Sequence, residues 1–173
     1  MLNLHFPKLV KQIFGFIYSD EDSYLKSLEI LRGIYGPSDY ESQKLQFSYT
    51  DYYAPEMGSP LYRRFVSFLK LQEANNFVNI KLTAIEVEKQ FLVAGNRLVN
   101  LDPGYINDAK LVLTTTKDFA HRIYLDKGVY AEVTLCYRNG MFRHLETTFP
   151  DYRTCDYQDI FLSIRNLYRG QLT

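Results

Sequence analysis

The stretch from residue 99 to 135, VNLDPGYINDAKLVLTTTKDFAHRIYLDKGVYAEVTL, decides the fold, because turn residues and charged groups in it separate strand-like apolar runs. Asp126-Lys127-Gly128 predicts a short hairpin loop with glycine in the left-handed conformation. Residues 129–137 alternate between apolar and polar side chains, as a half-buried strand does. Asn139-Gly140 is the strongest hairpin signal in the chain. Residues 110–148 are therefore predicted to form a three-strand antiparallel meander.

The loop length of the first hairpin sets which charged residues face each other across it. A three-residue loop places Arg122 opposite Glu132, and unlike charges that face each other on a sheet attract. A two-residue loop would instead place Ile123 opposite Glu132. We favour the first register, which puts Arg122 and Glu132 on one face of the sheet and His121 on the other. Arg122 and Glu132 are therefore predicted to form a cross-strand ion pair.

The same stretch is predicted to begin with a short strand and a turn. Residues 98–101 are a short apolar run, and Asp102-Pro103-Gly104 is predicted to turn the chain, because proline fixes φ and glycine accepts a positive φ. This turn would present Asp102 at the end of a strand.

The remaining segments predict further strands and helices. Two strands are predicted from apolar runs and alternation, at residues 9–18 and 40–53. Helices are predicted from apolar spacing and capping residues, over residues 20–35 and 61–69 and in a last segment that begins after Thr154 or Asp156. Residues 80–91 fit either a strand or a helix, and we favour the helix.

Length and charge limit the fold class and the partners. The 173 residues predict a single α+β domain over residues 1–173, with a mainly antiparallel sheet covered by helices. Twenty basic and twenty acidic residues give zero formal charge, so we expect no nucleic-acid partner. No apolar run approaches the roughly 20 residues that span a bilayer, so we expect no membrane partner. Cys136 and Cys155 lie outside any metal-binding spacing, and we interpret them as reduced thiols of a cytoplasmic protein.

Charged residues in the middle of the chain are the candidates for a functional site. The phosphate-loop, dinucleotide, nucleophile-elbow and zincin motifs are absent, which excludes those classes of enzyme. Lys117, Asp118, His121 and Arg122 instead lie within six residues. Lysine and arginine together can hold a phosphate or a carboxylate, and histidine titrates near neutral pH, which suits acid–base chemistry.

Two groups of site residues are predicted. The candidate acid–base groups are His121, Glu132 and Asp102. The candidate ligand-binding residues are Lys117, Arg122, Arg153, Asp151 and Glu56. We expect the loops around Asp102, Lys117 and Asp151 to meet at one end of the sheet and form an anion site.

Structural roles stay open beside these functional ones. His121 could be a hydrogen-bonded structural histidine, and Arg122 with Glu132 could be an ion pair that only stabilises the sheet. No metal site is predicted. The alternative, an Mg²⁺ or Mn²⁺ site, would use four oxygen ligands at no known spacing, namely Asp51, Glu56, Asp102 and Glu132.

Five motifs carry a resemblance to a known family. They are, in order, FSYTDYYAPEMGSPLYRRF, VNLDPGYI, KLVLTTTKDFAHRIYL, GVYAEVTL and TFPDYRT. Together they resemble the bacterial and archaeal family called domain of unknown function 4416, and the resemblance spans nearly the whole chain. Its members are often labelled GTP-binding proteins, but the resemblance implies no established activity. In this chain Thr116-Lys117-Asp118 matches a guanine-specificity motif poorly, and no phosphate loop accompanies it.

Two functions of different classes remain open. The first is an enzyme or binding protein for a small phosphorylated or carboxylated ligand, with nucleotides among the candidates and no cofactor identified. The second is a non-catalytic interaction or structural protein, with a homo-oligomer as one form. Convergence of the predicted residues in one concave pocket would favour the first function.

Overall fold

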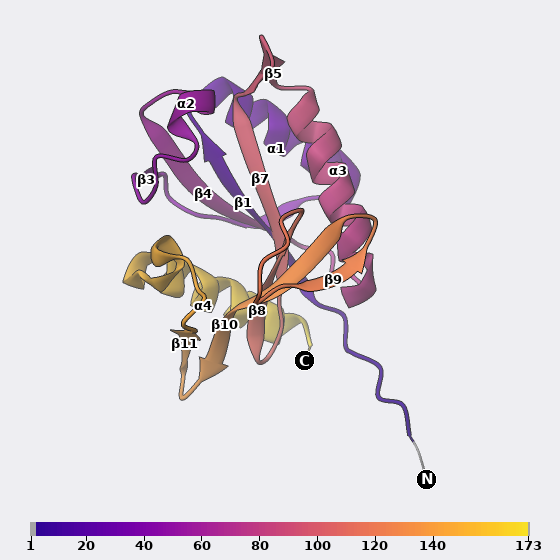
Figure 1. Cartoon of the computed structure of the whole chain (residues 1–173). Coiled ribbons are helices and arrows are strands. Elements are labelled where there is room, and N and C mark those ends of the chain that lie inside the picture. Colours follow the sequence, from indigo (N-terminus) through magenta and orange to yellow (C-terminus); the bar gives the residue numbers. More distant parts are fainter. Residues whose placement is uncertain (1–2, 173) are drawn as a thin grey trace.

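A nine-stranded sheet, antiparallel at each of its pairings, forms the centre of the protein (Figure 1). The structure is a computed structural model that describes residues 3–172. The strand order is β11-β10-β8-β7-β1-β4-β2, with β3 paired to β4 and β9 paired to β10. The strands are β1 (Lys11–Tyr18), β2 (Ser38–Glu41), β3 (Leu45–Phe47), β4 (Leu61–Phe68), β7 (Val99–Ile106), β8 (Lys110–Thr115), β9 (Ile123–Asp126), β10 (Val129–Arg138) and β11 (Met141–His144).

Helices cover both faces of this sheet, which confirms the predicted α+β class (Figure 1). The helices are α1 (Glu21–Tyr35), α2 (Ala54–Met57), α3 (Phe77–Lys89) and α4 (Cys155–Gln171), with 3-10 turns η1 (Ala74–Asn76) and η2 (Pro150–Arg153). A small hairpin, β5 (Leu92–Val93) with β6 (Asn96–Arg97), follows α3. Helices α1 and α3 share one buried cluster with the sheet, and α4 shares a second cluster on the other face.

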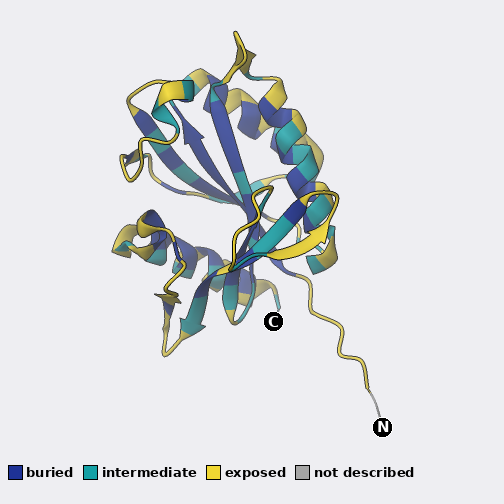
Figure 2. Cartoon of the chain, viewed as in Figure 1, coloured by how far each residue is buried: buried dark blue, intermediate teal, exposed yellow. Residues whose placement is uncertain are grey.

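Strand β1 lies in the middle of the sheet, between β4 and β7, and confirms the strand predicted at residues 9–18. All eight of its residues are buried (Figure 2). Phe14 and Phe16 pack towards α1 and α3, whereas Ile13 packs in the cluster of α4. A strand that is buried on both faces needs apolar side chains at successive positions, which explains why this strand does not alternate.

The prediction of a helix over residues 61–69 is wrong, because this segment forms β4. Its apolar residues fit helical spacing only because both faces of β4 contact a hydrophobic cluster. Phe65 packs in the cluster of α4, and Val66 and Phe68 pack in the cluster of α1 and α3. Arg63 and Arg64 therefore point to opposite faces of the sheet.

The predicted turn at Asp102-Pro103-Gly104 is also wrong, since β7 runs straight through these residues. Gly104 is required here by close packing, because a Cβ atom at this position would collide with the carbonyl oxygen of Val112 on β8. Pro103 lies just outside the β7–β8 ladder, which spans Gly104 to Ile106, and this position is compatible with the missing amide hydrogen.

The C-terminal half contains the predicted hairpins, β9–β10 and β10–β11, and β8 pairs with the other edge of β10. The β9–β10 loop has two residues, but an irregularity next to it restores the favoured register, so that Ala131 faces Ile123. Continuing this register brings Arg122 to Glu132, as predicted. His121 does not lie on the opposite face, because it precedes β9 and contacts the same carboxylate.

The other predicted strands and helices differ less from the observed ones. The strand predicted over 40–53 is two shorter strands, β2 and β3, because the chain leaves β4 between them and then enters a loop before α2. Helix α3 confirms the favoured interpretation of residues 80–91, although it begins at Phe77. Helices α1 and α4 lie where predicted, and the side chain of Thr154 caps α4. Among residues 3–172, no helix has both the length and the apolar character needed to cross a membrane.

Candidate functional site

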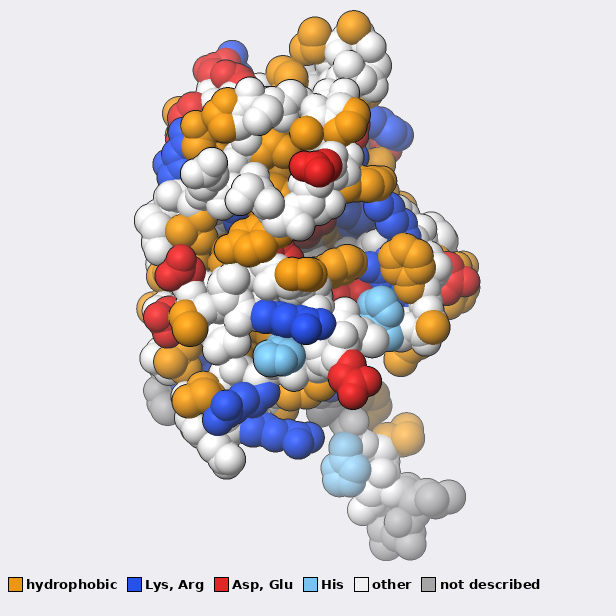
Figure 3. Space-filling view, turned by 60° about the vertical axis from the view of Figure 1, so that its left-hand side comes forward, with side chains coloured by type: hydrophobic (Ala, Val, Ile, Leu, Met, Phe, Trp, Pro, Cys, Tyr) orange, Lys and Arg blue, Asp and Glu red, His pale blue; other side chains and the backbone are white. Residues whose placement is uncertain are grey.

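A pocket of about 440 Å³ is lined by residues of α3, β3, β4, β6, β7, β8, β10 and η2 and by the loops at 49–53 and 116–122. This volume lies within the range of about 300–1,000 Å³ that is typical of small-molecule sites. On the face shown in Figure 3, hydrophobic side chains lie at the surface around acidic and basic groups recessed below them. The outer aromatic side chains of the pocket are exposed, namely Tyr49, Tyr52, Phe119 and Phe149.

The inner end of the pocket is organised around Arg63 of β4. Its guanidinium donates from Nη1 to Asp102 Oδ2 at 2.9 Å and from Nη2 to Asp151 Oδ2 at 3.1 Å. Only 3% of the Arg63 side chain is exposed, and a buried charge is tolerated where it is paired and hydrogen-bonded. Arg63 therefore joins β4, β7 and η2 through two carboxylates.

Glycine and aromatic residues make the space for this guanidinium. A Cβ atom on Gly15 of β1 would lie 2.9 Å from Arg63 Nη1, so a larger residue would displace it. The guanidinium carbon lies 5.2–6.0 Å from four ring centroids, those of Phe47, Phe65, Tyr152 and Tyr157. Such contacts favour a cation where water is excluded.

The pKa values of the two carboxyl groups bound to Arg63 are shifted in opposite directions. Burial acts to raise the pKa of Asp102, but the charges of Arg63 and Lys81 and the hydrogen bonds from Arg63 and Asn100 hold it below its usual value. Burial raises the pKa of Asp151, because Arg63 compensates only partly. One guanidinium thus holds one carboxyl that is readily ionised and one that is not.

These shifts predict opposite pH dependences for two variants. A lowered pKa in the folded state stabilises the protein above the ordinary pKa, and this contribution is lost as the pH falls; a raised pKa stabilises it at low pH, and this contribution is lost as the pH rises. Relative to wild type, the free energy of unfolding of Asp102→Asn should therefore decrease from about pH 3 to pH 7, whereas that of Asp151→Asn should increase. Urea unfolding across this range measures both, and slopes of the same sign would contradict the assignment.

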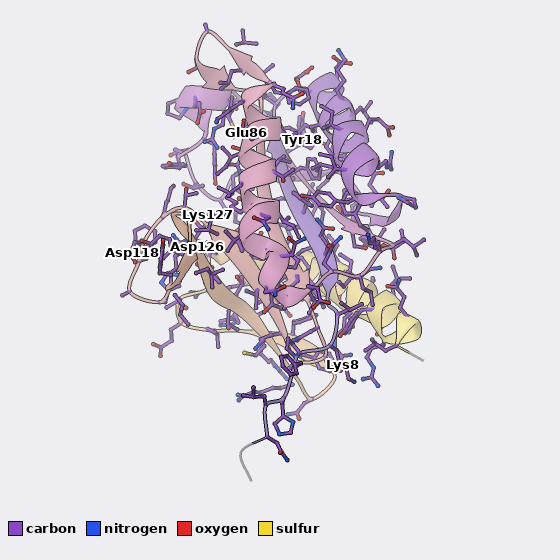
Figure 4. All side chains as sticks on the ribbon, turned by 90° about the vertical axis from the view of Figure 1, so that its right-hand side faces the viewer. Lys8, Tyr18, Glu86, Asp118, Asp126 and Lys127 are labelled. Carbon is purple, nitrogen blue, oxygen red and sulfur yellow. The ribbon has the colours of Figure 1, made fainter. Side chains whose placement is uncertain are left out.

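A second polar network lies beside the first, between α3 and β7. Glu88 of α3 accepts from the Leu101 amide at 2.6 Å and from Arg97 Nη1 at 3.3 Å. Lys81 lies on the same face of α3 as Glu88 and donates from Nζ to the carbonyl oxygen of Leu101 at 3.0 Å. Burial raises the pKa of Glu88 in spite of the Lys81 charge. Glu86, two residues before Glu88, lies on the outer face of α3 instead (Figure 4).

The predicted ion pair forms the wall of the pocket on β10. Arg122 Nε donates to Glu132 Oε2 at 2.8 Å, and their side chains are only 4% and 3% exposed. His121 Nε2 lies 2.9 Å from the same oxygen. The Arg122 guanidinium also packs against Phe119, with its carbon 4.5 Å from the ring centroid. The pair is therefore buried and cannot be treated as a surface salt bridge.

Lys117 lies at the outer part of the pocket, on the loop between β8 and β9. Its ammonium lies 3.9 Å from the centroid of the Tyr52 ring. Within residues 3–172 this ammonium forms no ion pair and no hydrogen bond, in contrast to the paired arginines of the pocket. Asp118 projects outward from the same loop (Figure 4). Lys117 is thus a cation that remains available to a ligand.

The structure brings most of the predicted site residues together. Five of them line the one pocket, namely Asp102, Lys117, Arg122, Glu132 and Asp151. His121 contacts Glu132 but is not part of the lining.

Two predicted ligand-binding residues lie outside the pocket. Glu56 of α2 binds Arg97, from Oε1 to Nε at 2.7 Å and from Oε2 to Nη2 at 2.9 Å, and reaches the pocket only through that arginine. Arg153 is not part of the pocket lining and donates to the carbonyl oxygens of Thr148 and Glu146, so it holds a loop.

Comparison with known protein families identifies the family of this chain. The family described as "Domain of unknown function (DUF4416)" matches residues 8–168. The chain belongs to the DUF4416 family. No curated protein and no solved structure matches this DUF4416 chain.

In this DUF4416 protein, three of the four carboxylates considered as Mg²⁺ or Mn²⁺ ligands are paired with arginines. Glu56 binds Arg97, Glu132 binds Arg122, and Asp102 binds Arg63, while Asp51 is exposed. In the part of the chain that the structure describes, no three His, Cys, Asp or Glu residues are placed to hold a metal ion.

Sequence reasoning missed several pocket residues of this DUF4416 protein. Arg63 was assigned to a helix, although the alternation of Leu61, Arg63 and Phe65 on one side of a strand could have placed it. Lys81 and Glu88 are seven residues apart on α3, a spacing that puts both on one helical face. No local signal marks Arg97, because its partners come from α2 and α3.

Proposed function

We propose that the pocket binds a small molecule that carries a phosphate or a carboxylate. The observation that supports this proposal is the ammonium of Lys117, which has no ion-pair or hydrogen-bond partner in the described part of the chain and lies in a pocket that also contains Arg122. Arg122 Nη2 forms no hydrogen bond with any residue from 3 to 172, so two cations on one side of the pocket retain donors for an anion. Charge-assisted hydrogen bonds of this kind are about twice as strong as neutral ones.

The same pocket offers groups for proton transfer. Among the three candidate acid–base residues, Asp102 is the one whose side chain is both in the lining and substantially exposed, at 25%. Glu132 is almost fully covered by Arg122 and His121. If the protein is an enzyme, Asp102 is therefore the group that would exchange a proton with the ligand.

The proposal predicts the outcome of a thermal-shift screen against nucleotides, phosphorylated metabolites and small carboxylates. A ligand at a hundred times its Kd should stabilise the protein by about 2.7 kcal/mol. Lys117→Met should leave the melting temperature of the free protein nearly unchanged, because Lys117 forms no ion pair with the residues that the structure describes. It should abolish the shift given by any anionic hit. Lys70→Met, at an exposed lysine outside the pocket, is the matched control.

Two results would count against the proposal. Unfolding of Lys117→Met would make Lys117 a structural residue. A ligand-induced shift that survives in Lys117→Met as well as in Lys70→Met would place the ligand elsewhere on the molecule.

A second function, self-association without catalysis, is favoured by strand β9. All four of its residues are exposed, and three of them are the large apolar or aromatic residues Ile123, Tyr124 and Leu125 (Figure 2). Among residues 3–172, β9 pairs only with β10, so its outer edge presents unpaired backbone groups to which a second copy could add a strand. Light scattering during gel filtration tests this candidate, and a monomer at high concentration would remove it.

A further inference from the structure

The inner end of the pocket contains an acceptor that is not saturated. Asp102 accepts one hydrogen bond from Arg63 and one from Asn100 Nδ2, the latter at 3.0 Å. A carboxylate has about four acceptor positions, so about two have no donor among residues 3–172. A quarter of the side chain is exposed, and Asp102 lines the pocket. A bound molecule that reaches Asp102 must therefore offer hydrogen-bond donors, which a phosphate or carboxylate at neutral pH does not.

A donor with unused capacity lies at the same end. The Lys81 ammonium has three N–H donors, and the carbonyl of Leu101 is the one acceptor it reaches among residues 3–172. Its side chain comes from α3 and reaches the backbone of β7 at the residue directly before Asp102, and Lys81 and Asp102 both line the pocket. The inner end therefore presents a free acceptor and free donors near each other.

Hydroxyl groups satisfy both kinds of partner, because a hydroxyl donates one hydrogen bond and accepts others. A ligand ammonium would donate to Asp102 but would repel Lys81 and Arg63 and leave the donors of Lys81 unused. A second ligand carboxylate would accept from Lys81 but would repel Asp102. Neutral hydroxyls are the groups that fit both residues.

The middle of the pocket suits the carbon skeleton of such a ligand. The outer wall is formed by the exposed rings of Tyr49, Tyr52, Phe119 and Phe149, which offer flat apolar faces to C–H groups. Lys117 packs on one of these rings, Tyr52, so the cation and the apolar surface are adjacent.

We infer that the ligand is a phosphorylated polyol or sugar. Its phosphate binds Lys117 and Arg122 at the outer part of the pocket, its hydroxyls bind Asp102 and Lys81 at the inner end, and its carbon chain lies along the aromatic rings. This inference rests on the proposed function, since it names the class of ligand for the same site.

Calorimetric titration with matched ligands tests the hydroxyls separately from the phosphate. Ribose 5-phosphate and n-pentyl phosphate share a phosphate ester and a five-carbon chain but differ in hydroxyl groups. Ribose 5-phosphate should bind at least tenfold more tightly, since hydrogen bonds to charged groups are the stronger class. Asp102→Asn should remove most of this difference. Lys81→Met is a second variant that should do the same if Asp102→Asn does not fold.

The outcomes separate the two proposals. Equal affinities for ribose 5-phosphate and n-pentyl phosphate would overturn the inference while the proposed anion site stands. Tighter binding of 4-aminobutyl phosphate than of ribose 5-phosphate would also overturn it, because the inner group would then be an ammonium. If no phosphate or carboxylate binds, the proposed function fails and the inference fails with it.

Discussion

Replacing Arg63 by methionine is expected to lower the free energy of unfolding by roughly 3–5 kcal/mol, the cost of removing one partner of a buried ionic network. The variant leaves Asp102 and Asp151 without their common cation in a site where Asp151 is only 7% exposed. Methionine retains much of the volume of the side chain, so the loss reports charge pairing more than packing. Urea unfolding at neutral pH measures it.

A matched control uses an exposed arginine–carboxylate pair. Arg169 binds Asp108 at 2.7 Å with the arginine side chain 55% exposed, so Arg169→Met should lower the free energy of unfolding far less than Arg63→Met does. The triple variant Arg63→Met, Asp102→Asn, Asp151→Asn should recover part of the stability, because no uncompensated carboxylate remains. Equal costs for Arg63→Met and Arg169→Met would show that Arg63 does not organise the inner end of the pocket.

The second large effect is expected for Glu132→Ala. This change leaves the guanidinium of Arg122 buried without its carboxylate and also removes the partner of His121. The free energy of unfolding should fall by roughly 3 kcal/mol, well above the value of about 0.2–1 kcal/mol for exposed pairs.

The control for Glu132→Ala is Glu86→Ala on the outer face of α3. Glu86 binds Lys89 at 2.6 Å, and both side chains are more than half exposed. Its removal should change the free energy of unfolding by less than about 1 kcal/mol. If the two glutamate variants unfold at the same urea concentration, the buried pair of Arg122 and Glu132 contributes no more to stability than the exposed pair of Glu86 and Lys89.

The parts of the fold that the sequence predicted are those with local signals. The buried run of β1, the caps of α1 and α4, and the Asn139-Gly140 turn each specify their own structure within a few residues. The position of β1 between β4 and β7 has no such signal, because pairing between strands about 50 and 90 residues apart depends on how the whole sheet buries its faces.

The residues of the candidate site also fall into those that a local sequence signal marks and those that no local signal marks. Lys117, Arg122 and Glu132 could be predicted together because they lie within sixteen residues, on the loop before β9 and on β10. Asp102 was singled out for a turn that does not exist, and its real place is the middle of a strand, beside Arg63. Arg63 was missed because apolar residues on both faces of β4 imitate helical spacing. Contacts between residues far apart in the sequence depend on how the whole sheet packs, so no local motif predicts them.

Amide chemical shifts of the ¹⁵N-labelled protein, recorded during titration with ribose 5-phosphate, show whether a phosphorylated ligand binds in the pocket next to Lys117. We expect saturable shifts at Lys117 and Phe119 at the outer part and at Asp102 and Leu101 at the inner end, with none at Lys70. Shifts confined to residues outside the pocket, or no saturable shift at millimolar ligand, would contradict it.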